Sequence, residues 1–334
     1  MKNNMKRLLV GSGIAAAGAA AVTSAVSYAI TKNMVEIALD REVPKNIISD
    51  EKTKKQLKGY ETDDALLSKL ADAGEKLKTC THETVEITSH DGEKLTGHWR
   101  PCENPERILL AMHGWRSSWD RDFGIIADFW YRNNCSVLYA EQRGQGDSGG
   151  DYMGFGMIER YDCRRWLDWI NDNCDSDLPV YLGGVSMGAA TVLMATGLEL
   201  PSSVRGVVAD CGYTSAHAIW KHVAENNLHL SYGIRGAVAN ALCKKKINMG
   251  TNDYSTVEAL RENKIPVLFI HGADDHFVPV EMTYENYEAC SAPKKLFVVP
   301  GADHGMSYLV DREGYENALR EFWRENDRRT IDDA

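Results

Sequence analysis

The chain has 334 residues, of which 43% are hydrophobic and 26% are charged, a composition that can bury a full core and excludes intrinsic disorder. Its formal net charge of -10 argues against a nucleic-acid partner, because phosphate binding needs a basic face. The eight cysteines include no Cys-x-x-Cys pair, which argues against a zinc site; most are expected to be buried free thiols, although an even count permits disulfides.

Residues 1–30 are expected to be a membrane anchor or a signal segment. Three basic residues among the first seven precede an uncharged stretch, Leu8 to Ile30, which as a helix could cross a bilayer core of about 30 Å. The basic start predicts a single-pass anchor in the cell membrane, with the rest of the chain outside the cytoplasm. Ser27-Tyr28-Ala29 is similar to a cleavage site, so a secreted product is the alternative. A buried alanine-rich helix of a soluble domain is the third interpretation.

Residues 31–79 form a polar linker that is expected to contain one amphipathic helix. Leu66, Leu67, Leu70 and Leu77 recur at helical spacing within 63–77. This helix would dock on the following domain or serve as a stalk, and no chemistry is expected from it.

From residue 80 to 334 the pattern is that of one α/β domain. Strands are predicted at 83–88, 94–99, 107–112, 136–140, 179–185, 204–209, 266–270 and 295–299, with helices at 120–133, 158–170, 189–200 and 312–324. Alternating strands and helices predict a mostly parallel eight-stranded sheet with helices on both faces. The first two strands, joined by a turn at His90-Asp91-Gly92, should form an antiparallel edge.

The interval 215–263 is too long for a plain connection between two strands. Helical patterns around 218–230 and 234–244 predict a helical cap inserted over the carboxyl edge of the sheet. Trp220 and Tyr232 of this cap are expected to contact a substrate. Ligands of such sheets bind at the carboxyl ends of the strands, where the polar clusters of this sequence also fall.

One of these clusters is Gly184-Val185-Ser186-Met187-Gly188, at the join of a buried strand and a helix of small residues. A side chain at either glycine would clash with the neighbouring strand and helix. The turn would push the Ser186 hydroxyl out above the sheet edge, at the positive end of the helix. Such patterns also occur by chance, but the strand before it and the helix after it favour a nucleophile.

A serine nucleophile needs a base, and the base needs an orienting carboxylate. The loop His271 to Pro279 follows one strand and offers Asp274 or Asp275, and the segment Gly301 to Gly305 follows the last strand and offers His304. His276 is too close to the acid in the chain to face it. His113 and His271 precede glycines at strand ends and are expected to brace loops.

From about Glu83 to Asn326 the chain resembles an α/β-hydrolase of the serine esterase/lipase and prolyl-oligopeptidase-like type, and bacterial members with an N-terminal membrane segment are most similar. The family pattern His-Gly-x-x-Asp-x-x-Val-Pro matches His271 to Pro279 and implies that Asp275 is the acid. His304 matches the family histidine. His113-Gly114-Trp115 resembles the family His-Gly-x segment, which implies that the backbone N–H groups of Trp115 and Met187 form an oxyanion hole.

A second family turn, Asp-x-Arg-Gly-x-Gly-x-Ser, is similar to the segment from Glu141 to Ser148. Glu141 stands where the family has aspartate, and we interpret this as a tolerated change. The role of the turn is expected to be structural, with Arg143 tying loops together. It is not a phosphate cradle, because neither a Lys-Ser/Thr pair nor a dinucleotide fingerprint accompanies it.

The resemblance implies a serine hydrolase that cleaves carboxylic esters through an acyl-enzyme, with a small-molecule ester or acyl substrate and no metal or organic cofactor. A serine peptidase or acyl-aminoacyl hydrolase is the alternative within the enzyme class. A catalytically inactive binding protein on the same fold is the alternative outside it. The acyl group, the alcohol and the oligomeric state are left open.

Overall fold

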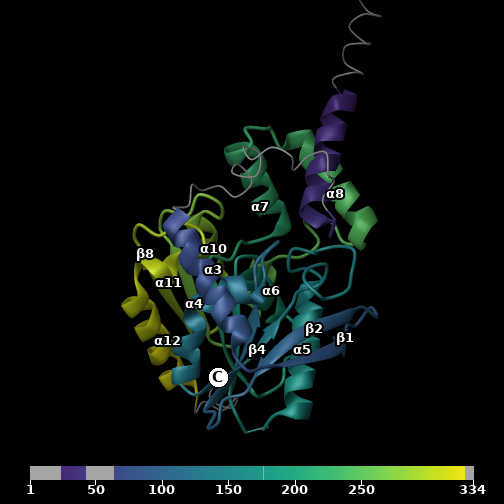
Figure 1. Cartoon of the computed structure of the whole chain (residues 1–334). Coiled ribbons are helices and arrows are strands. Elements are labelled where there is room, and N and C mark those ends of the chain that lie inside the picture. The colour runs from purple at the N-terminus through teal and green to yellow at the C-terminus, as the bar shows by residue number, and fades with distance from the viewer. Residues whose placement is uncertain (1–23, 43–63, 176, 328–334) are drawn as a thin grey trace, which may run out of the picture.

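The computed structural model describes residues 24–42, 64–175 and 177–327, and its centre is one eight-stranded sheet (Figure 1). The order of the strands is β1-β2-β4-β3-β5-β6-β7-β8. β2 is antiparallel to both neighbours, and all other pairs are parallel. The strands are β1 Glu83–Thr88, β2 Lys94–Arg100, β3 Arg107–Met112, β4 Cys135–Ala140, β5 Val180–Val185, β6 Val204–Asp210, β7 Val267–Gly272 and β8 Lys294–Val299.

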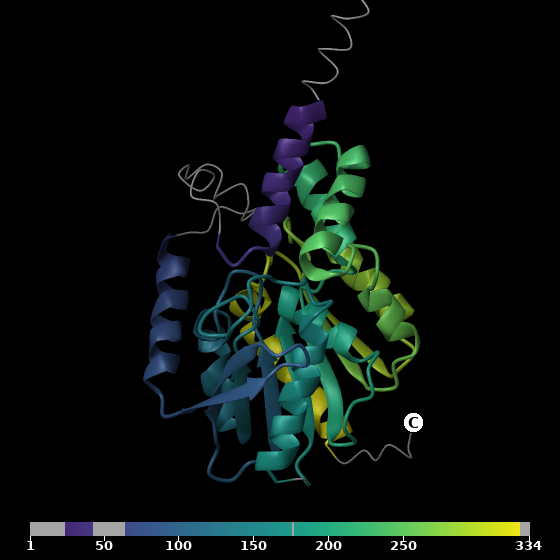
Figure 2. The same cartoon turned by 90° about the vertical axis from the view of Figure 1, so that its right-hand side faces the viewer.

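Helices cover both faces of the sheet (Figure 2). Because successive strand residues point to opposite faces, the core is divided into two layers. Tyr181 and Val208 pack with α4 and α12, whereas Leu182 and Val207 pack with α5 and α6. The helices are α3 Asp64–Thr79, α4 Trp119–Arg132, α5 Glu159–Asn173, α6 Met187–Ala195, α7 Ala216–His222, α8 Gly233–Ile247, α9 Thr256–Arg261, α10 Val280–Ala289, α11 Ser307–Val310 and α12 Arg312–Asn326. The predicted mostly parallel sheet with helices on both faces is therefore confirmed.

α3 docks on the domain along α4. The two helices approach so closely that a Cβ at Gly124 would meet the backbone of Ala73. Leu77 is buried, and Lys78 forms an ion pair with Asp120 at 3.0 Å. Of the two roles expected for this helix, the structure shows the docked one.

Residues 24–39 form a further helix that lies beside α8 in both cartoon views (Figures 1 and 2). Val35 and Leu39 are buried in a cluster with Cys243 and Ile247 of α8, and Lys246 pairs with Asp40 at 2.8 Å. Within the described ranges, no helix is both long and apolar enough to cross a membrane. Residues 1–23 of the predicted anchor lie outside the described part, so the anchor is not supported here and stays a prediction.

Between β6 and β7 the chain forms α7, the π-helical turn Val223–Asn227, α8 and α9. The predicted single helix at 218–230 is thus two shorter segments. Trp220 and Tyr232 are buried in the same cluster as Phe155, to which the Trp220 ring is perpendicular with centroids 5.3 Å apart. These two aromatic side chains pack the base of the insertion.

The predicted strands agree with the observed ones to within about two residues, whereas some helices differ. The helix expected at 189–200 begins at Met187 and ends at Ala195, and α9, α10 and α11 were not expected.

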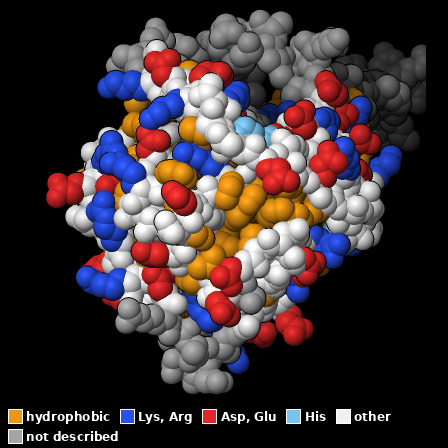
Figure 3. Space-filling model, turned by 60° about the horizontal axis from the view of Figure 1, so that its bottom comes forward, with side chains coloured by type: hydrophobic (Ala, Val, Ile, Leu, Met, Phe, Trp, Pro, Cys, Tyr) orange, Lys and Arg blue, Asp and Glu red, His pale blue; other side chains and the backbone are white. Residues whose placement is uncertain are grey.

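All eight cysteines are free thiols, five of them buried. On the face turned forward in Figure 3, hydrophobic side chains gather at a hollow surrounded by side chains of both charges.

Candidate active site

Ser186 lies in the turn between β5 and α6 with a backbone that few residues adopt, φ 55° and ψ -114°. The surrounding glycines make that turn possible. A Cβ at Gly184 would meet the carbonyl of Gly188, and one at Gly188 would meet the carbonyl of Met112. The Ser186 N–H donates to the carbonyl of Asp210 at 2.9 Å, which ties the turn to β6. The strain at Ser186 is of the kind that the surrounding structure must over-determine.

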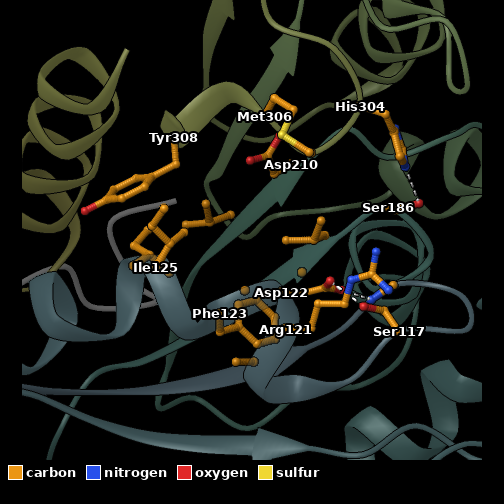
Figure 4. Close-up of a pocket in the computed structure, with 18 of the residues that line it drawn as sticks. Ser117, Arg121, Asp122, Phe123, Ile125, Ser186, Asp210, His304, Met306 and Tyr308 are labelled. Atoms are coloured by element: carbon orange, nitrogen blue, oxygen red, sulfur yellow. Dashed lines mark hydrogen bonds between the residues drawn. The ribbon is translucent and has the colours of Figure 1, made fainter. Parts of the chain in front are cut away.

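His304 connects the hydroxyl of Ser186 to the carboxylate of Asp275. Its Nε2 lies 3.0 Å from Ser186 Oγ, and its Nδ1 lies 2.7 Å from Asp275 Oδ2. Figure 4 shows the bond between the first pair. The three side chains follow β5, β7 and β8, so 118 residues of chain separate the serine from the histidine. The fold therefore brings together the three residues that the sequence placed in one relay.

Asp275 is held from several sides. Its Oδ1 accepts the backbone N–H groups of Phe277 and Val278 at 2.9 and 2.8 Å. His271 Nε2 lies 3.1 Å from Oδ2 and 2.8 Å from the carbonyl of Val278, so this nitrogen carries the proton and donates. Asp274, the rival acid, is exposed. The geometry therefore favours Asp275.

The electrostatics of this pair favour an imidazolium beside a carboxylate. Burial alone would lower the pKa of His304, but the charge of Asp275 and its hydrogen bond raise that pKa well above the ordinary value. Burial would likewise raise the pKa of Asp275, but the charge of His304 and the hydrogen bond from His271 hold it well below its usual range. Asp275 consequently stays ionised and can stabilise a positive His304.

The loop after β3 passes directly beside Ser186. A Cβ at Gly114 would lie 3.4 Å from Ser186 Cβ. Asp122 of α4 fixes this loop, because its Oδ2 accepts the Gly114 N–H at 2.7 Å and its Oδ1 accepts the Ser117 hydroxyl. Among the described residues, none accepts a hydrogen bond from the backbone N–H of Trp115 or of Met187. Both expected oxyanion donors are therefore open.

The same loop is attached to the end of the helix at 24–39. Trp115 Nε1 donates to the carbonyl of Ala38 at 2.8 Å. Arg116, in the left-handed conformation with φ 49°, donates to the carbonyls of Ile37 and Asp40. Unpaired carbonyls at a helix C-terminus need such partners. Nothing in the sequence motifs indicated this attachment or the role of Asp122.

The remaining motif residues brace the loops. His113 Nε2 accepts the Gln142 N–H at 3.1 Å, and His271 Nδ1 contacts Thr283 Oγ1 at 2.6 Å. Arg143 binds Asp162 through two nitrogens at 2.6 Å each and Asp91 at 2.7 Å. These contacts match the loop-bracing expected of both histidines and the loop-tying expected of Arg143.

The substituted glutamate of the second family turn has its own partners. Glu141 Oε1 contacts His98 Nε2 at 2.8 Å, and Oε2 accepts the N–H of Asp147. Glu141 thus connects the turn to β2.

Two groups of possible metal ligands occur in the described part of the chain. Cys211, Asp275 and His304 place their ligand atoms within 4.8 Å of one another, but two of them belong to the relay. His90, Asp91 and Asp162 form the other group, and Arg143 pairs with both of its carboxylates. The arrangement of these side chains does not favour a metal centre.

A pocket of about 320 Å³ opens at Ser186 and His304. Most of its lining is apolar and comes from β3, β5, β6, α4, α11 and α12. Asp210 is a buried exception: burial raises its pKa to about 6, and its carboxylate accepts the hydroxyl of Tyr315 at 3.0 Å. Neither Trp220 nor Tyr232 is among the lining residues, so the expectation that they contact a substrate is not supported.

A sheet of this order, with the nucleophile turn after β5 and the acid and the histidine after β7 and β8, is the α/β-hydrolase fold. Residues 103–263 match the family described as serine aminopeptidase, S33. The match supports a place in the α/β-hydrolase superfamily and a hydrolytic enzyme. The finer function is not fixed by it.

Curated relatives are similar over most of their length. The uncharacterized protein YqkD of Bacillus subtilis is 24% identical over 78% of this chain and 87% of its own. Protein bem46 of Schizosaccharomyces pombe is 25% identical over 74% of this chain and 78% of its own.

Solved structures share the fold. An esterase of Pyrococcus furiosus superposes with a TM-score of 0.62 at 23% identity, covering 75% of this chain and 94% of its own. The esterase domain of a Rhodothermus marinus protein gives 0.54 at 20% identity, covering 74% and 99%. The acylaminoacyl peptidase of Pyrococcus horikoshii gives 0.55 at 14% identity, covering 77% and 44%.

Proposed function

We propose that the protein is a serine hydrolase that cleaves carboxylic esters through an acyl-enzyme. The observation that carries this proposal is the position of His304, within hydrogen-bonding reach of both Ser186 Oγ and Asp275 Oδ2. The accepting atom of a general base must lie about 2.6–3.2 Å from the heavy atom that bears the proton. The 3.0 Å separation of Nε2 and Oγ meets that requirement.

In the first half-reaction, Ser186 Oγ forms a bond to the acyl carbon while its proton passes to His304 Nε2. The carbonyl oxygen gains the negative charge, and the N–H groups of Trp115 and Met187 stabilise it. The bond from the acyl carbon to the alcohol oxygen then breaks, and His304 returns the proton to the departing alcohol. In the second half, water attacks the acyl carbon by the same proton path and releases the acid and free Ser186.

Labelling by a fluorophosphonate, combined with turnover of p-nitrophenyl acetate, tests this proposal. We expect the wild-type protein to be labelled once and to hydrolyse the ester. Ser186→Ala should abolish labelling and lower kcat by about 10⁴ or more, as removal of a triad member does. Ser202→Ala is the control, because it removes an exposed serine hydroxyl outside the relay, and this variant should still be labelled. A Ser186→Ala protein as active as wild type would contradict the proposal.

A peptidase is the second candidate, because the matched family is described as serine aminopeptidase and one structural neighbour is an acylaminoacyl peptidase. The relay at Ser186 could cleave either bond. Comparing kcat/KM for an acyl p-nitrophenyl ester with that for the p-nitroanilide of the same acyl group, and for an aminoacyl p-nitroanilide, decides between them. Faster turnover of either anilide than of the ester would favour the peptidase.

A further inference from the structure

The pocket at Ser186 continues as an apolar channel along one face of the sheet. It follows β5 from Val185 past Gly183 to Tyr181, a distance of about 13 Å at the usual strand rise. α4 forms one wall, and α11 and α12 form the other. Figure 4 shows Ile125 of α4 and Tyr308 of α11 on opposite walls, away from Ser186.

Small side chains on the sheet leave the space that forms this channel. Ala111, Gly183 and Val208 are neighbours in register on β3, β5 and β6, and all three line it. A Cβ at Gly183 would have only one atom within 4 Å, the Leu110 carbonyl oxygen at 3.9 Å, and the residue does not need a positive φ. The space above Gly183 is therefore open, and a larger side chain there would enter the channel rather than the core.

Aromatic side chains lie at the end of the channel farthest from Ser186, where Trp323 of α12 and Tyr181 of β5 line it. Phe129 of α4 and Trp323 of α12 stack with centroids 5.7 Å apart and an interplanar angle of 16°. Trp323 is 2% exposed, and the hydroxyl of Tyr181 donates to Asp327 Oδ1 at 2.9 Å. α4 and α12 are thus in contact at this stack, beside Trp130 and Trp323, which line the channel.

We propose that this channel binds the acyl chain of the substrate, and that the substrates are esters of linear aliphatic acids. The proposal rests on the proposed esterase function. The acyl group stays bonded to Ser186 after the alcohol leaves, so an apolar channel that begins at Ser186 suits the acyl part, whereas the alcohol must leave to solvent. An extended chain of about ten carbons spans about 13 Å, and each buried methylene strengthens binding by about fourfold.

Under this assignment, the sheet and helices α4, α11 and α12 determine which acyl-chain length is preferred. The insertion between β6 and β7 does not. Trp220 and Tyr232 of the insertion pack instead into a cluster with Phe155 and with Val35 and Leu39 of the helix at 24–39. Selectivity then depends on the residues over which the chain would lie, above all on Gly183.

The test is a graded series, Gly183→Ala, Gly183→Val and Gly183→Leu, assayed with p-nitrophenyl esters from acetate to dodecanoate. We expect the ratio of kcat/KM for decanoate to that for acetate to fall stepwise, by at least tenfold in Gly183→Leu. Gly233→Leu is the matched control, because Gly233 is exposed at the start of α8 and its Cβ would have only Ser231 Oγ within 4 Å. That variant should keep the wild-type ratio.

A second series with a fixed acetyl group and alcohols of rising length separates the two parts of the ester. A ratio unchanged in Gly183→Val and Gly183→Leu, or a change confined to the alcohol series, would overturn the channel assignment. Fluorophosphonate labelling of each variant reports whether Ser186 is intact; if Gly183→Leu fails to fold, the fall from wild type to Gly183→Ala decides. A wild-type protein that neither labels nor hydrolyses any ester would instead overturn the esterase function.

Discussion

The Arg116 guanidinium donates two hydrogen bonds to the carbonyl oxygen of Ile37, from Nε at 3.1 Å and from Nη2 at 2.8 Å. Arg116 follows Trp115, the expected oxyanion donor, and Ile37 lies in the last turn of the helix at 24–39. A segment expected to be a linker without chemistry therefore supports the loop that would stabilise the transition state.

Arg116→Ala should lower kcat by about tenfold, because a displaced oxyanion donor loses part of the 10²–10³ that such a donor contributes. KM should change less than threefold, since the loop would act mainly on the transition state. Arg116→Lys, which keeps one donor, should recover part of the loss. Steady-state kinetics on p-nitrophenyl acetate check this, and a folded Arg116→Ala protein with wild-type kcat would show that the attachment does not matter for catalysis.

Asp122→Asn should also lower kcat by about tenfold with little change in KM, because the amide cannot accept both of the hydrogen bonds that fix the loop. The rate of fluorophosphonate labelling should fall in parallel. Asp128→Asn is a suitable control, since Asp128 lies on the same helix and is half exposed. If the control and Asp122→Asn lose activity equally, the effect is one of helix stability.

kcat/KM should rise with pH along an ascending limb whose midpoint lies above pH 6.5. His304 acts as a base only when neutral, and Asp275 raises its pKa above that value, so protonation removes activity as the pH falls. Asp275→Asn should move the limb to lower pH and lower the plateau, because burial alone lowers the pKa of His304. A wild-type limb below pH 6 would contradict the pairing seen here.

Asp210→Asn should stabilise the protein more at pH 8 than at pH 4. Burial raises the pKa of Asp210 from 3.8 to about 6, so the folded state holds its proton more tightly than the unfolded chain, and stability falls as the pH rises through this range. The change amounts to about 3 kcal/mol at most. Urea unfolding at both pH values measures it, and an equal effect of the substitution at pH 4 and pH 8 would contradict it.

Much of the sheet could be predicted because its central strands are continuous apolar runs buried on both faces, as Arg107–Met112 shows. The candidate site could be predicted because each reactive residue follows such a run within a short motif. Asp275 needed the family pattern, since spacing alone left Asp274 open; the structure separates them by exposure.

Contacts between distant segments could not be predicted. Arg116 and Ile37 are 79 residues apart, and no periodicity connects them. The channel was missed for a related reason. It depends on the space between α4 and α12 and on the open space above Gly183, whereas the sequence drew attention to the large aromatic residues of the insertion. Short helices such as Thr256–Arg261 carry too few turns to show a pattern.

The stack of Phe129 on Trp323 would act as a molecular ruler if the channel holds an acyl chain. Trp323 lines the channel at the end near Tyr181, so this stack would set the longest acyl chain that the channel can hold without bending. A smaller residue at Trp323 would let the channel hold longer acyl chains. A series of substitutions there would change the preferred chain length without altering Ser186, Asp275 or His304.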